Sequence, residues 1–268
     1  MKKIIAIVFL FFAGCLFWSF RSTPVESEFA FTPGEKLVYK IFYNWNFVWL
    51  AAGEIVFEIK EEQEAYHIEV TGKTYASYEW FYKVRDKYHS YIDKKTGLPK
   101  LYIRDIHQGD YRHYEKIVFD YQNHKATSYT GKRFDQLKSQ EIDLDGNYYD
   151  MISSMYFLRN IKIEDFKKER HRGFKLILDN RKYNLNLKYV ADKDQFKVKE
   201  SGTYNAFHAI GDVITGNVFK DDVQMNFWIS NDSNMLPVML ESPLVVGSVK
   251  GILASYTNLK YPFSAKVN

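Results

Sequence analysis

The sequence predicts an all-β protein, built as one large curved antiparallel sheet or open barrel with one central helix packed on the concave side. Polar and apolar residues alternate along much of the chain, turn residues recur at short intervals, and aromatic residues are abundant. The 268 residues include 21 Tyr, 21 Phe and 5 Trp, and aromatic side chains favour strands and bury large areas. An antiparallel sheet of this length has to curl, close or split into two layers. Two β lobes joined near residues 135–165 are the alternative architecture.

Strand-like alternation starts soon after Phe31 and recurs along the chain. One set of alternate positions is apolar and the other is mostly polar, which is the pattern of half-buried strands. Turns such as Gln108-Gly109-Asp110 and Asp179-Asn180 separate these runs, and connections this short favour hairpins over crossovers. We expect about a dozen strands on this basis. The clearest runs are 37–43, 53–59, 66–70, 183–189 and 196–198.

Two segments depart from the strand pattern. Tyr148–Ile161 has helical periodicity, with Asn147 as its expected N-cap and Asp150 in the first turn. Most of its residues are apolar, so we expect this helix to be buried or to lie across the mouth of the curved sheet. Ser77–Tyr82 is interpreted as one helical turn that packs aromatic side chains.

The first 21 residues have the layout of a signal peptide or membrane anchor. Lys2 and Lys3 precede the uncharged run Ile4–Phe20, and Arg21 follows it. Three fates remain open: cleavage, retention as an anchor, or lipidation at Cys15, which follows Ala13-Gly14. All three predict export to the periplasm or cell envelope. Residues 22–32 are expected to be a linker, and 33–262 a single antiparallel β domain.

Charge and motif content exclude several classes of function. The formal net charge is +4, and outside the leader 34 basic residues face 33 acidic ones, so no nucleic-acid partner is expected. Cys15 is the only cysteine, which rules out an internal disulfide and a thiolate zinc site. A two-residue turn at 109–110 pairs His107 with Arg112, so that His113 points to the opposite face. No catalytic residue, metal ligand or cofactor is expected.

Carboxylates in neighbouring predicted strands leave one enzymatic alternative open. Asp86 and Asp105 each follow an arginine in the sequence. Glycosidases hydrolyse their substrates with two carboxyl groups that face each other across a cleft. Cross-strand ion pairing on one face of the sheet is the plainer interpretation. The alternative function is therefore an envelope glycan-processing enzyme that uses these two residues as acid and base.

A series of short motifs in a fixed order resembles an uncharacterised bacterial family, domain of unknown function 3108. The resemblance extends from Phe31 to Leu259 and implies an exported all-β protein of the bacterial envelope, without implying any activity. The helix-bearing curved sheet also resembles the lipoprotein-carrier folds of the periplasm, in architecture only. The motifs are Pro33–Leu37, Ala52–Glu54, Trp80–Asp86, Tyr91–Asp93, Leu98-Pro99, Arg104–Ile106, Tyr149–Arg159, Trp228–Ser230 and Leu236–Val238.

The preferred functional hypothesis is a non-enzymatic envelope protein that binds an apolar or amphipathic ligand, either a lipid or a lipidated partner. A curved sheet rich in aromatic residues either fills its concave face with side chains or leaves an apolar groove there. A structural module that offers an edge strand or aromatic patch to another envelope protein is a further alternative. The expected ligand-binding residues are Trp45, Trp49, Trp80, Phe81, Met151, Met155 and Trp228.

Overall fold

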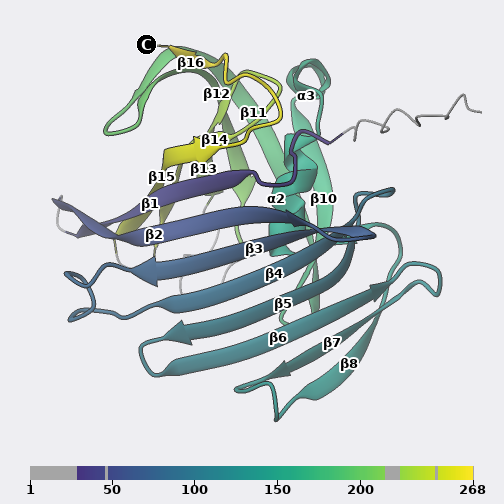
Figure 1. Ribbon diagram of the computed structural model, residues 1–268. Helices are drawn as coiled ribbons and strands as arrows, with labels where there is room; N and C mark the ends of the chain where they lie inside the picture. Colours follow the sequence, from purple (N-terminus) through teal and green to yellow (C-terminus); the bar gives the residue numbers. More distant parts are fainter. Residues whose placement is uncertain (1–28, 46–47, 215–223, 245–246, 268) are drawn as a thin grey trace, which may run out of the picture.

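A computed structural model describes residues 29–45, 48–214, 224–244 and 247–267 (Figure 1). The leader at 1–21, including Cys15, lies outside the described residues, as does most of the expected linker. Within these residues strands dominate the fold, and two short helices interrupt them near the middle of the chain.

The first half of the chain is an eight-stranded antiparallel meander. Each strand pairs with the next along the chain, so β1 to β8 lie in sequence order within the sheet. In Figure 1 strands β2 to β8 form a broad curved layer, with α2 and β10 behind it. The strands are β1 (Lys36–Trp45), β2 (Val48–Glu61), β3 (Ala65–Thr74), β4 (Arg85–Asp93), β5 (Pro99–Gln108), β6 (Tyr111–Asp120), β7 (Lys125–Gly131) and β8 (Lys138–Asp143).

The second half is another meander, and it joins the first because β15 pairs with β1. The path of paired strands runs from β8 through β1 and β15 to β9, and β9 pairs with β10 in parallel. β8 and β9 are the two edges of this path, so the sheet is strongly curved and not closed. The elements are β9 (Tyr148–Tyr149), α2 (Met151–Arg159), α3 (Ile163–Glu169), β10 (His171–Leu178), β11 (Arg181–Val198), β12 (Gly202–Asp212), β13 (Gln224–Ser230), β14 (Pro237–Pro243), β15 (Ser248–Thr257) and β16 (Lys266–Val267).

The predicted fold class is confirmed, and two local expectations are corrected. The central helix begins at Met151, because Tyr148 and Tyr149 pair with β10 as strand β9. The N-cap is therefore Asp150 and not Asn147. The Asp150 carboxylate accepts hydrogen bonds from the backbone N–H groups of Ile152 and Ser153 at 2.8 and 2.9 Å. The sequence also gave no signal for α3, which buries a single side chain, Phe166.

Helix α2 is tied to the concave side of the sheet at its N-terminus. The buried hydroxyl of Ser90, on β4, donates to the Asp150 carboxylate at 2.8 Å. Burial raises the pKa of the Asp150 carboxyl, and the hydrogen bonds from Ser153 and Ser90 oppose that rise. One residue thus caps the helix and fixes it to β4.

A buried ion pair holds the other end of α2. The Arg159 guanidinium forms a bidentate contact with Glu35, at 2.5 and 2.8 Å, and the two side chains are 2% and 0% exposed. Arg159 also donates to the carbonyl oxygens of Asn234, at 3.0 Å, and Ala30, at 3.1 Å. The pair therefore joins α2 to the segment before β1 and to the turn between β13 and β14.

The concave face under α2 is filled by side chains. Ser90, Tyr102, Ile117 and Ser128 are successive ladder partners on β4 to β7, and all four are fully buried. Tyr156 of α2 packs in the same cluster of buried side chains. Among the described residues, no helix is long and apolar enough to cross a membrane.

We predict that Arg159→Met lowers the free energy of unfolding by about 3–5 kcal/mol, because Glu35 is left as a buried charge without its partner. Urea unfolding followed by circular dichroism measures the change. Lys36→Met is the matched control, because Lys36 forms an exposed pair with Glu58, and it should change stability by no more than about 0.5 kcal/mol. Equal effects of the two variants would show that the buried pair has no special role.

Candidate functional site

An aromatic groove lies where the β1–β2 hairpin meets the connection between β3 and β4. Both segments lie at the same end of the curved layer in Figure 1. The groove encloses about 210 Å³, and none of its lining residues is charged. The lining residues are Tyr43, Leu50, Ala51, Ser77, Tyr78, Trp80 and Phe81.

Large apolar side chains around this groove are unusually exposed. Trp80 is 82% exposed and Phe81 is 48% exposed. Within the described residues, Val48, Leu50 and Tyr82 are also exposed, so these two segments hold most of the large exposed apolar side chains. Single exposed apolar residues are ordinary on protein surfaces, whereas a contiguous patch marks an interaction site.

Hydrogen bonds fix the backbone of the segment that carries these aromatics. Tyr75 N–H donates to Ala52 on β2 at 3.0 Å, and Lys83 accepts from Gly109 N–H at 2.8 Å. Between these anchors the chain forms consecutive turns, and Tyr82 N–H donates to the Tyr78 carbonyl oxygen at 3.2 Å, which is the hydrogen bond of a single helical turn, as expected for Ser77–Tyr82. The segment is therefore held at both ends by the sheet.

Ring contacts organise the aromatic side chains of the groove. The Phe81 ring stacks on Tyr43 with centroids 6.4 Å apart, and it meets Tyr78 edge-on at 5.4 Å. Trp80 contacts the same ring at 6.0 Å. Phe81 thus links the hairpin to the connecting segment, while Trp80 stays exposed.

The structure brings two of the seven expected ligand-binding residues, Trp80 and Phe81, into this groove. Trp49 lies under the ammonium of Lys250, at 4.1 Å, and Trp45 ends β1 opposite Val48.

The other three expected residues lie in the second half of the chain. Met151 is exposed on α2, and Met155 packs against buried residues. Trp228 stacks on the rings of Phe196 and His208. Trp80 and Phe81 therefore lie in the groove, whereas Met155 and Trp228 pack against a different cluster of buried side chains.

Tyr43, Leu50 and Tyr78 were not expected at the site. A signal for part of the patch exists, because Val48–Ala52 is apolar at consecutive positions of a strand and so exposes apolar side chains on both faces. The meeting of this strand with Tyr78 and Phe81 depends on tertiary structure.

The two carboxylates of the enzymatic alternative point to opposite faces of the sheet. Asp105 is the ladder partner of Lys87, so Asp86, the next residue on β4, faces the other side. Asp86 is buried and accepts from Gln108 Nε2 at 2.6 Å and from His107 N–H at 3.0 Å. Burial raises its pKa, opposed by these hydrogen bonds. The pair cannot act together on one bond.

A second group of charged residues is already neutralised by an arginine. His113, Glu115 and Asp179 lie close enough to hold an ion. Arg104 occupies that position, with its Nη2 3.0 Å from Glu115 and in contact with Asp179. The cluster joins the β10–β11 turn to β5 and β6, which is a structural role.

The open, curved antiparallel sheet with a helix on its concave side defines a β-barrel-like protein. The chain belongs to a family of proteins of unknown function, DUF3108, whose model matches residues 38–254. It is similar to the crystal structure of a β-barrel-like protein of domain of unknown function DUF1849 from Brucella abortus, with a TM-score of 0.54 and 9% identity over 83% of this chain and 96% of that one. At this identity the likeness shows the fold alone. No curated protein matches the chain.

We predict that Asp86→Asn lowers the free energy of unfolding by about 1–3 kcal/mol, because an amide leaves one of the donors at Gln108 or His107 unpaired. Asp105→Asn, at a half-exposed site on the other face, should stay within about 0.5 kcal/mol of the native protein. Thermal and urea unfolding measure both. Equal losses in the two variants would contradict the assignment of Asp86 to a buried network.

Proposed function

We propose that this protein is exported to the cell envelope and, without catalysis, binds the hydrocarbon end of an amphipathic lipid in the aromatic groove. The observation that carries the proposal is the exposure of Trp80 and Phe81 beside an apolar groove on a body whose concave face is packed. Burying such surface against a hydrocarbon chain is favourable at roughly 25 cal/mol per Å².

The size of the groove favours a single hydrocarbon chain over a larger ligand. Its volume of about 210 Å³ is below the roughly 300–1,000 Å³ of pockets that enclose a drug-sized molecule. A ligand bound here keeps its polar part outside. That is the behaviour of an amphipathic molecule, which inserts one apolar end.

Charges beside the groove suit a zwitterionic headgroup. Glu79 lies between two lining residues in the sequence, and its carboxylate pairs with Lys83 at 3.8 Å and with Arg85. The lining itself has no charge. An apolar floor with both signs of charge at its rim matches a hydrocarbon chain that ends in a phosphate and an amine.

Export is proposed from the leader. Residues 1–21 combine a basic start, an uncharged apolar run and a polar continuation, as export signals do. Retention of this segment, or lipidation at Cys15, would associate the protein with the membrane through its N-terminus. The proposal of export rests on the leader, because the matching family is described only as one of unknown function.

The two alternative functions have less support. The opposed directions of Asp86 and Asp105 weigh against a glycan-processing enzyme. For an assembly module that offers an edge strand, β8 carries mostly charged and polar residues, which discourage the addition of another strand. A module that offers an aromatic patch would use the same exposed Trp80 and Phe81, and the crosslinking experiment below separates it from lipid binding. A lipidated protein could supply the same kind of hydrocarbon chain as a free lipid. The test below distinguishes these two sources.

We predict that the double variant Trp80→Ser/Phe81→Ser binds a lysophosphatidylethanolamine at least about tenfold more weakly, a loss of roughly 1.4 kcal/mol. Titration with a spin-labelled analogue below its micelle concentration, read by electron paramagnetic resonance, measures the affinity in both proteins, because this readout does not depend on Trp80. Trp80 is exposed, but the Phe81 ring contacts Tyr43 and Tyr78, so we expect a small fall in melting temperature, and the titration is done well below it.

Phe134→Ser is the matched control for this titration, because Phe134 is an equally exposed aromatic side chain outside the groove. Native affinity in the groove variant, or an equal loss in the control, would refute the assignment. A photoreactive residue at position 80 also allows crosslinking in cells. If the protein binds no lipid but crosslinks to a lipidated protein, that protein is the ligand of the groove.

We predict that cells producing the full chain hold it in the envelope fraction, and that a chain starting at Ser22 stays in the cytoplasm. Labelling with palmitate, compared between the native chain and Cys15→Ser, separates lipidation from simple retention. Recovery of the full chain in the cytoplasm would contradict export.

A further inference from the structure

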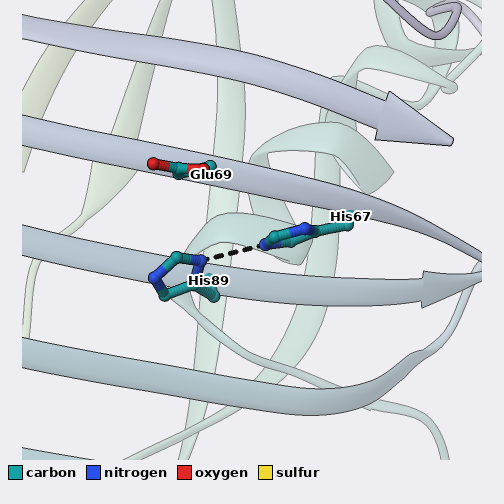
Figure 2. A group of neighbouring side chains, drawn as sticks. All are labelled: His67, Glu69 and His89. Atoms are coloured by element: carbon teal, nitrogen blue, oxygen red, sulfur yellow. Dashed lines mark hydrogen bonds between the residues drawn. The ribbon is translucent and has the colours of Figure 1, made fainter. Parts of the chain in front are cut away.

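Two imidazoles and a carboxylate meet on the convex face of β3 and β4. His67 and Glu69 are two residues apart on β3, so their side chains share a face. His89, on β4, is the ladder partner of Glu69. Figure 2 shows His67 and Glu69 along one strand and His89 on the neighbouring strand, with the two rings directed at each other.

The distances within this cluster are those of a nearly formed coordination sphere. The Nε2 atom of His67 lies 2.9 Å from the Nδ1 atom of His89. One potential ligand atom from each of His67, His89 and Glu69 lies within 4.8 Å of the other two. Ligand atoms around a tetrahedral zinc ion are about 3.3 Å apart, given bonds of about 2.0–2.1 Å. Small side-chain movements bring these three groups to that spacing.

The surroundings of His67 hold its ring in an orientation suited to a ligand. Its second nitrogen, Nδ1, lies 3.2 Å from a carboxylate oxygen of Glu62. A carboxylate on the far nitrogen fixes the tautomer and the ring plane of metal-binding histidines. The Tyr91 ring stacks on His67 with centroids 4.2 Å apart. The His67 side chain is only 11% exposed, so the ring has little freedom to turn away.

The protonation states also suit metal binding. Burial lowers the pKa of both imidazoles, and the neighbouring His89 lowers that of His67 further. Neutral imidazole is the form that binds a metal.

A lysine is the present partner of the carboxylate, and it can leave at small cost. Lys60 contacts Glu69 at 2.5 Å, but its side chain is 54% exposed. An exposed ion pair of this kind contributes about 1 kcal/mol or less. This separates the cluster from the one around Arg104, whose guanidinium is largely buried between Glu115 and Asp179.

We propose that His67, His89 and Glu69 form a binding site for a divalent transition-metal ion, with zinc as the ion that the donor set fits. Two imidazole nitrogens and one carboxylate oxygen are typical zinc ligands, whereas calcium and magnesium prefer oxygen alone. The convex face leaves the fourth position to water. Glu62 is a positioning residue, because it acts on the metal only through the His67 ring. The site is separate from the groove that contains Trp80, so neither proposal depends on the other.

Isothermal titration of the chelator-treated full-length protein with zinc chloride tests this site. The expected result is one saturable equivalent of zinc and a melting temperature that rises with zinc concentration. His89→Gln should weaken the affinity by more than about 100-fold, and Glu62→Gln by about 10–100-fold. Cobalt replaces zinc as a probe, and its visible absorption reports the ligand set directly.

His107→Gln is the matched control, since His107 is a half-exposed imidazole beside a single carboxylate, Asp105. It should leave zinc affinity and the cobalt spectrum unchanged. Glu69→Gln, at a more exposed position, is the second variant if the histidine variants fail to fold, and it should also weaken zinc binding. The proposal is overturned if the native protein shows no saturable binding, if folded His89→Gln binds equally well, or if the control weakens binding as much.

Discussion

The buried pair of Glu35 and Arg159 is the constraint on which the rest of the fold depends. Removing two charges from water is costly, and the cost is met here by a bidentate contact and two further bonds to carbonyl oxygens. Glu35 immediately precedes β1, the strand at which the two meanders join. By holding α2 against that junction, the pair keeps the helix over the concave face, where Asp150 secures its other end on β4.

The position of the helix also bears on the proposed ligand site. With the concave face occupied by buried side chains, apolar surface becomes available at the rim, around Trp80 and Phe81. The same packing explains the buried acids. Asp86, Asp150 and Glu115 have raised pKa values because they are buried, and each meets hydrogen-bond donors or a cation from the protein itself. A perturbed acid is a functional candidate only when it faces a cleft, and these three are structural.

The sequence was sufficient for the fold class because alternation and turn chemistry are local signals. It was insufficient where a distant strand decides the outcome. Asn147 and Asp150 are equally good caps, and the parallel pairing of Tyr148 and Tyr149 with β10 selects Asp150. Of the groove, composition identified Trp80 and Phe81, whereas the position of Tyr43 follows from the β1–β2 register and its irregularity after Ile41.

The ladder that runs from β3 through β4 to β5 brings the proposed metal ligands together and keeps the carboxylates of Asp86 and Asp105 apart. The register that sets Glu69 opposite His89 gathers three metal-binding groups on the convex face, although two of them are twenty residues apart in the chain. The continuation of that register sets Asp105 opposite Lys87 and turns Asp86 inward. A slip of one residue would reverse both results, because it moves every side chain of a strand to the other face. Spacing along the chain therefore says little about sites in a meander of this kind, and position in the ladder determines which side chains can act together.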